Sequence, residues 1–452
     1  MIHSIIQKSQ LEGAHRLDAE YYQPEYLKYS EQLNRLKLAD LNFLTSKVDV
    51  GFVSSMVSHF QDKGVPLLRT QNVCEFFIDA ENDVVYIDEE FHKKLRKSQI
   101  FPGYLLLARS GSIGNVGIVP ENFPVANSAD IILIKTKSDK ITPEFLAAFL
   151  NSKYGRYQVE RGSSGGLQGH INLFSLEKLL VPIIDQKFQE QIAHLIRQGL
   201  FMVEESRNFY QQAENLLLEE LGLKDFKVED DLSFVVNFSG VKSAHRIDAE
   251  YFQPKYDKLI SKLKDQKSKP LTEVIDSVAA KSNPQTEPDK IFRYVELANI
   301  DSSIGIIDGF SEVLGKEAPS RAKRILKVGD VIVSSVEGSL EKVALVNKEQ
   351  EDHLASTGFF QFRSKEILPE VLLVLARSIV LRMQLEKQCA GTILTAVSEK
   401  SLKNIVVPIL LNSTQQKIAD LVRQSHEARK KAKELLEKAK RKVENMIEKG
   451  GE

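Results

Sequence analysis

Polar side chains of the types that read base edges in DNA gather in loops of both halves of the chain. Arg, Lys, Asn, Gln, Ser, Thr and Glu can form hydrogen bonds with base edges when a rigid frame presents them. The same residue types close turns and cap helices, and for any single residue that simpler interpretation comes first. As a set on matching loops of two copies, they indicate DNA readout. The candidates are Lys47, Ser54, Ser55, His59, Arg69, Thr70, Gln71, Arg109, Ser110, Ser112, Gln168 and His170 in the first half, and Lys281, Ser282, Asn283, Gln285, Ser335, Glu337, Ser339, Lys342, Thr392 and Thr395 in the second.

Catalytic chemistry has no comparable basis in the sequence. The chain lacks a glycine-rich phosphate loop ending in Lys-Ser/Thr, and it lacks the Asn/Asp-Pro-Pro-aromatic tetrapeptide of an amino-methyltransferase. Its 9 histidines are scattered, and its 2 cysteines fall in different halves, which disfavours a zinc site or a disulfide. Asp88-Glu89-Glu90 is typical of solvated surface charge rather than of a metal cluster. We therefore predict a chain without catalytic residues or a metal.

The overall charge limits how this protein can hold a nucleic acid. The 452 residues include 61 basic and 62 acidic side chains, so phosphate contacts must come from local lysines and arginines or from a partner. No apolar run approaches the ~20 residues that a membrane helix needs. We expect a cytoplasmic protein of two or three domains.

The elements that must position these loops occur twice. Residues 14–26 return as residues 244–256 with three changes, at Leu17/Ile247, Tyr22/Phe252 and Glu25/Lys255. Further along, matching residues lie 226 apart, for example Pro182 and Pro408. Short β-type runs dominate each half, with a first-half helix expected from Pro143 to about Val159. We predict a mixed α/β fold of two tandem pseudo-symmetric domains. The expected boundaries are 1–184 for the first domain, 185–221 for a first long helix, 222–242 for a linker, 243–410 for the second domain and 411–452 for a second long helix.

Apolar and small residues repeat every three and four positions through both long helices, which predicts an antiparallel coiled coil. The first helix is mainly acidic and the second mainly basic, which suits their pairing. Two unrelated solvated helices are the alternative interpretation. The predicted seam residues are Ile192, Leu195, Met202, Phe209, Leu216, Ile418, Leu421, Ala428, Leu435 and Met446.

The order of these elements resembles the specificity subunit of type I restriction-modification systems. The features that carry the resemblance are the duplicated Asp-Ala-Glu-Tyr-x-Gln-Pro, the Pro-Glu helix starts, and the Gln-x-x-Ile-Ala entries at 189–193 and 415–419. The resemblance implies two target-recognition domains, each reading one half of a split sequence in double-stranded DNA. It implies that the helices space these domains and dock two methyltransferase subunits, with two restriction subunits where a nuclease accompanies them.

The same resemblance places the chemistry elsewhere. S-adenosylmethionine, ATP and Mg would bind to the partner subunits, and this chain would bind no cofactor and no membrane. A coiled-coil scaffold that carries two interaction modules and binds no DNA is the competing hypothesis. The salt dependence of binding to duplex DNA separates the two.

Overall fold

A computed structural model describes residues 3–9, 11, 16–80, 82–111, 113–163, 170–391 and 395–450. The chain divides into two compact units, Met1–Val203 with Lys430–Glu452, and Glu204–Arg429. Both divisions fall inside the long helices α8 (Gln186–Glu220) and α14 (Asn412–Glu448). Each unit therefore combines one globular domain with part of each long helix.

Two sheets form the domain of the first unit. One has the order β2-β10-β7-β8, and the other has the order β3-β5-β4-β9-β6 with β4 and β9 parallel. A two-stranded ladder, β1-β11, stands apart from them. The strands are β1 (Leu38–Asp40), β2 (Thr45–Val50), β3 (Phe60–Gln61), β4 (Val65–Leu68), β5 (Val85–Ile87), β6 (Gln99–Ile100), β7 (Leu105–Ala108), β8 (Val116–Ile118), β9 (Ala126–Ser128), β10 (Ile131–Thr136) and β11 (Leu180–Pro182).

The central strands β7 and β10 are apolar on both faces because each face is covered. Successive side chains of a strand point to opposite faces. Leu105 and Leu107 accordingly join the core that includes helix α5 (Pro143–Asn151), whereas Leu106 and Ala108 join a second core with residues of the other sheet. This burial explains why the two strands read as continuous apolar runs instead of alternating ones.

The remaining helices of the first unit are α2 (Pro24–Leu33), α3 (Leu41–Leu44), α4 (Glu89–Lys94), α6 (Lys153–Gly162) and α7 (Leu173–Glu177). The single helix expected from Pro143 to about Val159 is wrong, because the chain breaks at Ser152. Ser152 has an extended backbone (ψ 164°), and its hydroxyl accepts a hydrogen bond from the Gly155 N–H at 3.4 Å, so it starts α6 as an N-cap.

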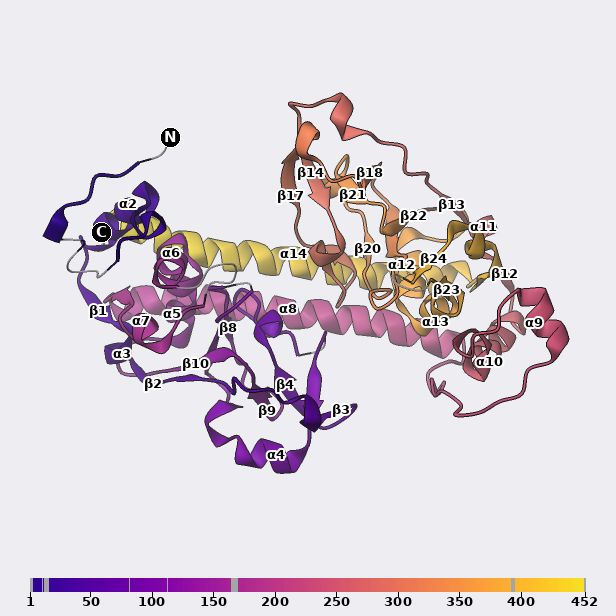
Figure 1. The fold of residues 1–452 in the computed structure, drawn as a ribbon, viewed down its shortest axis with the longest axis horizontal. Coiled ribbons are helices and arrows are strands. Elements are labelled where there is room, and N and C mark those ends of the chain that lie inside the picture. Colours follow the sequence, from indigo (N-terminus) through magenta and orange to yellow (C-terminus); the bar gives the residue numbers. More distant parts are fainter. Residues whose placement is uncertain are drawn as a thin grey trace. The chain divides into compact units, whose positions relative to one another are not determined.

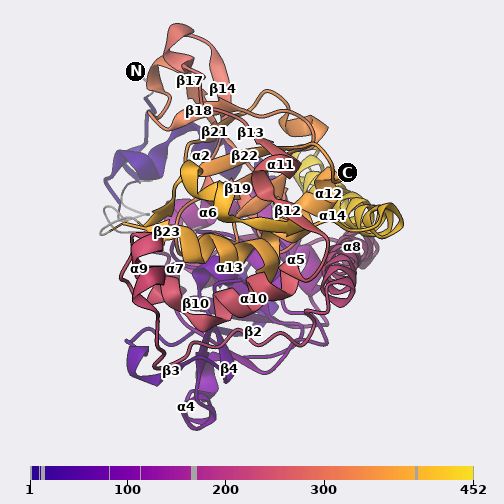
Figure 2. The ribbon, with the colours of Figure 1, turned by 90° about the vertical axis from the view of Figure 1, so that its right-hand side faces the viewer.

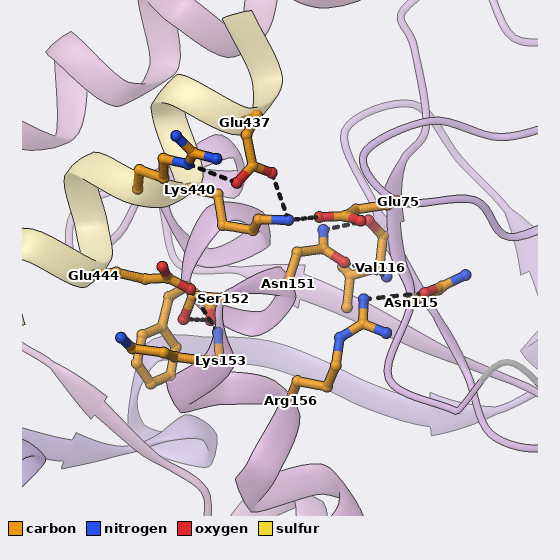
Figure 3. A network of polar contacts seen from close by, with 12 residues as sticks. Glu75, Asn115, Val116, Asn151, Ser152, Lys153, Arg156, Glu437, Lys440 and Glu444 are labelled. Atoms are coloured by element: carbon orange, nitrogen blue, oxygen red, sulfur yellow. Dashed lines mark hydrogen bonds and ion pairs between the residues drawn. The ribbon is translucent and has the colours of Figure 1, made fainter. Parts of the chain in front are cut away.

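The end of α14 is tied to this first domain by polar contacts (Figure 3). Lys440 Nζ lies 2.8 Å from carboxylate oxygens of both Glu75 and Glu437. The Lys153 N–H, at the start of α6, donates to Glu444 Oε1 at 2.8 Å. Residues close to the end of the chain therefore complete the domain that its beginning forms.

The second unit repeats the strand order of the first, except that the sheet matching β3-β5-β4-β9-β6 has four strands instead of five. Its sheets are β13-β22-β19-β20 and β17-β14-β21-β18, with β14 and β21 parallel, and its separate ladder is β12-β25. The prediction of two pseudo-symmetric mixed α/β domains is confirmed. The strands are β12 (Ser268–Pro270), β13 (Ile275–Ser277), β14 (Ile291–Val295), β15 (Ile300–Asp301), β16 (Ile306–Ile307), β17 (Ser311–Leu314), β18 (Ala322–Ile325), β19 (Asp330–Ser334), β20 (Val343–Leu345), β21 (Leu354–Ser356), β22 (Phe359–Ser364), β23 (Cys389–Ala390), β24 (Ala396–Val397) and β25 (Val406–Pro408).

Helices cover this second domain as in the first. They are α9 (Phe238–Ala244), α10 (Pro254–Lys264), α11 (Leu271–Val274), α12 (Pro369–Arg377) and α13 (Ile379–Gln388). Ser378 caps α13 and separates it from α12, as Ser152 separates α6 from α5. Helices α10 and α13 lie side by side in this unit (Figure 2).

The helices α8 and α14 run antiparallel as a coiled coil, which confirms the prediction (Figure 1). In the first unit, a Cβ atom built on Gly199 would lie 2.8 Å from Leu436, so the backbone of α8 approaches that side chain closely. In the second unit, the Ser425 hydroxyl donates to the Ser206 carbonyl oxygen at 2.7 Å. Small residues thus stand at close contacts between the two helices.

Several residues that are buried on these helices lie one position after a predicted seam residue. Ile192, Leu195, Ile418, Ala428 and Met446 are buried, whereas Met202, Phe209, Leu216, Leu421 and Leu435 are only half-buried. The buried residues at the corresponding steps of the heptad are Ile196, Val203, Tyr210, Leu217, Val422, Leu436 and Val443. Both neighbouring positions are apolar because each helix packs against its partner and against a domain. The apolar stripe is therefore wider than a two-position seam.

None of the helices that the structure describes is both long enough and apolar enough to cross a membrane.

Candidate nucleic-acid interface

A turn capped by an asparagine presents the first group of candidate residues. The turn η3 (Thr70–Asn72) follows β4, and the Asn72 Oδ1 accepts a hydrogen bond from the Arg69 N–H at 2.9 Å. The Arg69 guanidinium donates to the Asp83 carbonyl oxygen at 2.7 Å, which holds the loop together. Thr70 is half-buried, whereas the Gln71 side chain is exposed at the tip. Arg69 thus supports the turn, and Gln71 is the residue that can reach a ligand.

The second domain has the same turn with different chemistry. In η7 (Leu297–Asn299), which follows β14, Asn299 Oδ1 accepts from the Glu296 N–H at 2.9 Å. Asn299 lies 227 positions after Asn72, and Glu296 lies 227 positions after Arg69. The capping asparagine is unchanged, but an arginine has become an exposed glutamate. Glu296 was not among the residues expected from the sequence, although the repeated asparagine was the signal that could have found it.

Arg109 and Ser110 form a closed network inside the first domain. The Arg109 guanidinium donates to the Ile171 carbonyl oxygen at 3.0 Å and to Asp130 Oδ1 at 3.2 Å. The Ser110 hydroxyl donates to Asp130 Oδ2 at 3.0 Å. Asp130 has a left-handed backbone (φ 53°), and these contacts hold it in that conformation. The structure therefore places Arg109 and Ser110 in positioning roles.

Lysines and an aromatic ring form a local basic surface on the first domain. Lys47 on β2 and Lys135 on β10 are paired in register, and their ammonium groups lie 5.8 and 6.0 Å from the Tyr104 ring centroid. Lys47 Nζ also donates to the Lys97 carbonyl oxygen at 3.0 Å. Lys97 and Lys135 are exposed. Such a group of cations can contact phosphates in a chain with no excess of positive charge.

His59 is fixed against helix α4. Its ring stacks on Phe91 with centroids 3.7 Å apart, and Nδ1 lies 3.2 Å from the Asp88 carboxylate. Asp88 also caps α4 by accepting from the Phe91 N–H at 2.7 Å, so the Asp88-Glu89-Glu90 run is the start of a helix. Ser54 and Ser55 are exposed in the loop between β2 and η2 (Val57–His59).

A pocket in the second unit brings several candidates together. It has a volume of about 410 Å³ and lies between residues 280–285 and 318–323. Lys281, Ser282, Asn283 and Gln285 all line it, and Lys323 faces them from the other segment. The Ser282 N–H donates to the Lys323 carbonyl oxygen at 2.9 Å, and Asn283 Oδ1 accepts from the Gln285 N–H at 3.3 Å. The side chains of Lys281 and Gln285 are exposed.

Ser335, Glu337, Ser339 and Lys342 lie in the β19–β20 hairpin, and Thr395 lies beside it. The Ser335 hydroxyl donates to the Gly358 carbonyl oxygen at 2.9 Å, and the Ser339 hydroxyl donates to that of Val336 at 3.1 Å. Thr395 donates its hydroxyl to the exposed Glu337 carboxylate. Lys342 is half-buried at the base of the tip. Turn chemistry accounts for the two serines, which leaves Glu337 and Lys342 as the acidic and the basic candidate of this hairpin.

Three candidates, Ser112, Gln168 and Thr392, lie outside the described residues, and His170 is half-buried next to that undescribed segment. Among the residues that the structure describes, no group of His, Cys, Asp and Glu could hold a metal ion. Cys74 and Cys389 are not joined in a disulfide. Burial raises the pKa of Cys389 to about 11, so this thiol is a poor nucleophile.

Comparisons with known proteins identify the frame that carries these loops. Residues 69–199 match the family model of the type I restriction modification DNA specificity domain. This part of the chain is a DNA specificity domain of that family. The resemblance inferred from the sequence is thereby confirmed, and the specificity domain includes the Asn-capped turn, Arg109 and the start of α8. The methyltransferase subunit and DNA are the partners that this family implies.

Two solved structures of type I specificity subunits are similar to this chain. The S subunit from M. genitalium has 14% identity, covers 92% of this chain and 96% of its own, and has a TM-score of 0.41. The HsdS subunit from Thermoanaerobacter tengcongensis has 13% identity, the same two coverages and a TM-score of 0.28. A comparison with curated protein sequences gave no match.

Proposed function

We propose that this specificity subunit reads a two-part DNA sequence, one part with each domain. The proposal rests on one observation: the same Asn-capped turn follows the matching strands β4 and β14, yet the exposed polar residue that it offers is Gln71 in one copy and Glu296 in the other. A frame that is kept while its exposed residues change is what two readers of different bases require. Gln suits an adenine edge, and Glu suits the amino group of cytosine.

In this proposal the chain positions the partners and performs no catalysis. The coiled coil of α8 and α14 sets the separation of the two half-sites and docks two methyltransferase subunits. Those subunits supply S-adenosylmethionine and the methyl transfer to adenine. Where a nuclease accompanies them, two restriction subunits use ATP and Mg.

Genome-wide mapping of methylated adenines tests the proposal. A strain with this chain should carry a split motif with a fixed gap, and the motif should vanish when the gene is deleted. Replacing residues 45–136 with the corresponding segment of another specificity subunit should change only one half of that motif. Unchanged methylation after both manipulations would refute the proposal.

Binding to duplex DNA separates this function from that of a scaffold without DNA contacts. If a set of lysines neutralises phosphates, the logarithm of the binding constant falls linearly with the logarithm of the salt concentration. Lys47→Gln together with Lys135→Gln should reduce that slope by about two and weaken binding to every sequence alike. Absence of DNA binding at low salt, with partner binding intact, would favour the scaffold.

A further inference from the structure

In the repeated stretch, residues 14–26 and 244–256, some side chains have a structural role. In the first copy the Arg16 guanidinium makes two bonds to the Asp18 carboxylate, at 2.6 and 2.7 Å. The Tyr21 ring lies between two cations, with Arg16 at 5.0 Å and Arg161 at 4.0 Å from its centroid. Tyr22 is buried beside it. These residues fasten the stretch to α6.

The second copy is fastened in the same way to α13. The Arg246 guanidinium bonds to the Asp248 carboxylate at 2.8 Å, and the Tyr251 ring lies 4.6 Å from Arg246 and 5.1 Å from Lys387. Lys387 lies 226 positions after Arg161, so the second cation beside the ring is also retained. Packing thus explains why the arginine, the aspartate and the tyrosine occur in both copies.

Packing does not explain the residues between them. Leu17 is 87% exposed and its counterpart Ile247 is 89% exposed, although each stands between an arginine and an aspartate that are held in place. The next side chains, Ala19 with Ala249 and Glu20 with Glu250, are also exposed and are identical. Other exposed loops of the two halves have diverged. An exposed apolar side chain kept twice has no internal role, and such surfaces mark interaction sites.

A second apolar position supports this surface. Ile5 is 93% exposed and Val235 is 98% exposed, and each precedes the start of its repeat, Ala14 or Ala244, by nine positions. The neighbouring side chains show the same order in both copies, with Ser4 and Phe234 half-buried before the exposed residue and Ile6 and Val236 half-buried after it. The matched exposure therefore extends through two segments of each copy.

We propose that residues 17–20 and 247–250 are two copies of one docking site, and that each receives one methyltransferase subunit. Two equal sites on one chain fit two identical partners. Each site offers an aliphatic side chain beside a free carboxylate, so the partner must provide an apolar pocket with a basic rim. DNA is a poor occupant because Glu20 and Glu250 would repel phosphates. This inference rests on the proposed function and adds these loops to the docking role of the helices.

Native mass spectrometry of the full chain with its methyltransferase subunit tests the inference. Wild-type chain should bind two subunits. Leu17→Asp should leave one tight site, Ile247→Asp should leave the other, and the double variant should bind each subunit at least about tenfold more weakly, as expected for loss of a buried aliphatic side chain. Val125→Asp and Val328→Asp are matched controls, since both valines are exposed and neither belongs to the repeat; these variants should bind two subunits.

The milder Leu17→Ala and Ile247→Ala variants should follow the same pattern. They perturb the fold less than the Asp variants, and thermal melting followed by circular dichroism checks that every variant is folded. DNA binding by the chain alone should remain unchanged in all variants. If the wild-type chain does not bind DNA, the proposed DNA reading is refuted, whereas the proposed docking site is not. Two tightly bound subunits on the double variant would overturn the inference. So would a dimer of the free chain that Leu17→Asp dissociates, because the site would then serve self-association.

Discussion

Individual residues of the Asn-capped turns divide into supports and readers. Arg69 donates to a backbone carbonyl of its own loop, whereas Gln71 is exposed next to it. The residue type that looks most suited to a guanine edge therefore holds the turn in shape. A substitution of Arg69 changes the loop, and a substitution of Gln71 changes only what the loop offers.

Gln71→Ala should relax base preference at one position of one half-site by ~1–3 kcal/mol of discrimination and leave thermal stability unchanged. Arg69→Ala should lower the melting temperature and weaken recognition of that whole half-site. Binding to a panel of duplexes with single-base changes measures both effects. Equal loss of preference at both half-sites would contradict the division of labour between the two domains.

His426 on α14 gives the second unit a defined pH dependence. Burial lowers the pKa of His426, and its Nε2 lies 3.0 Å from the Ile304 carbonyl oxygen. Glu370, Arg377 and Asp301 are the charged groups around it. The folded chain therefore keeps this imidazole neutral at pH values where the unfolded chain, with a pKa of ~6.5, already takes up a proton.

The free energy of unfolding should consequently fall as the pH drops from about 7.5 through 6.5, since the unfolded state binds more protons there. His426→Gln should make this fall smaller, although His92 and His353, whose pKa values burial also lowers, still contribute. Urea unfolding at pH 7.5 and 5.5 measures the difference. His194→Gln, at an exposed position of α8, should retain the wild-type fall.

Among the elements, the coiled coil depends on its small residues. Gly199 faces Leu436 so closely that any Cβ atom would require a shift. Gly199→Leu should destabilise the first unit by ~1–3 kcal/mol through overpacking, in spite of the better helix propensity of leucine. Adding Leu436→Ala should recover part of that loss. The denaturant midpoints of unfolding of the two variants test this prediction. A midpoint of Gly199→Leu equal to that of the wild type would mean that the helices can move apart at this position at no cost in stability.

The order of elements could be predicted from the sequence because it follows from local pattern and from duplication. Short β-type runs, capping residues and the constant offset of 226 were enough for the fold class. The break at Ser152 could not be predicted, because Ser152 interrupts an apolar helical pattern that reads as continuous. Which apolar helix positions are buried could not be predicted either, since Leu216 and Leu217 are equally apolar, yet only Leu217 is buried.

The candidate site was predicted less completely than the fold, for a related reason. Sequence gives residue types, whereas a role in reading depends on whether the side chain is already engaged. Arg109, Ser335 and Ser339 are held by internal hydrogen bonds, but Lys281 and Gln285 are exposed at one pocket. Glu296 was missed because its importance follows only from its equivalence to Arg69.

At the scale of the whole molecule, the first unit needs both ends of the chain. Ending the protein after Arg429 removes Lys440 from Glu75 and Glu444 from Lys153, together with the buried Leu436, Ala439 and Val443. We expect this truncation to lower hydrogen-exchange protection throughout the first domain while the second domain, within residues 204–429, stays protected. Lys440→Ala with Glu444→Ala should act in the same direction more weakly. Equal loss of protection in both domains would contradict the division into two units.

The composition of the first unit also sets the order of events during synthesis. Domains generally fold as units while the chain emerges from the ribosome, and the N-terminal one folds first. Here the earliest domain lacks residues 430–450 until the whole second unit, one uninterrupted segment, has been translated. The domain that is made first is thus finished only after the second one. Until then its helix-facing surface, which includes Ile192 and Ile196, has no covering segment, so this is the stage at which a nascent chain most needs a chaperone.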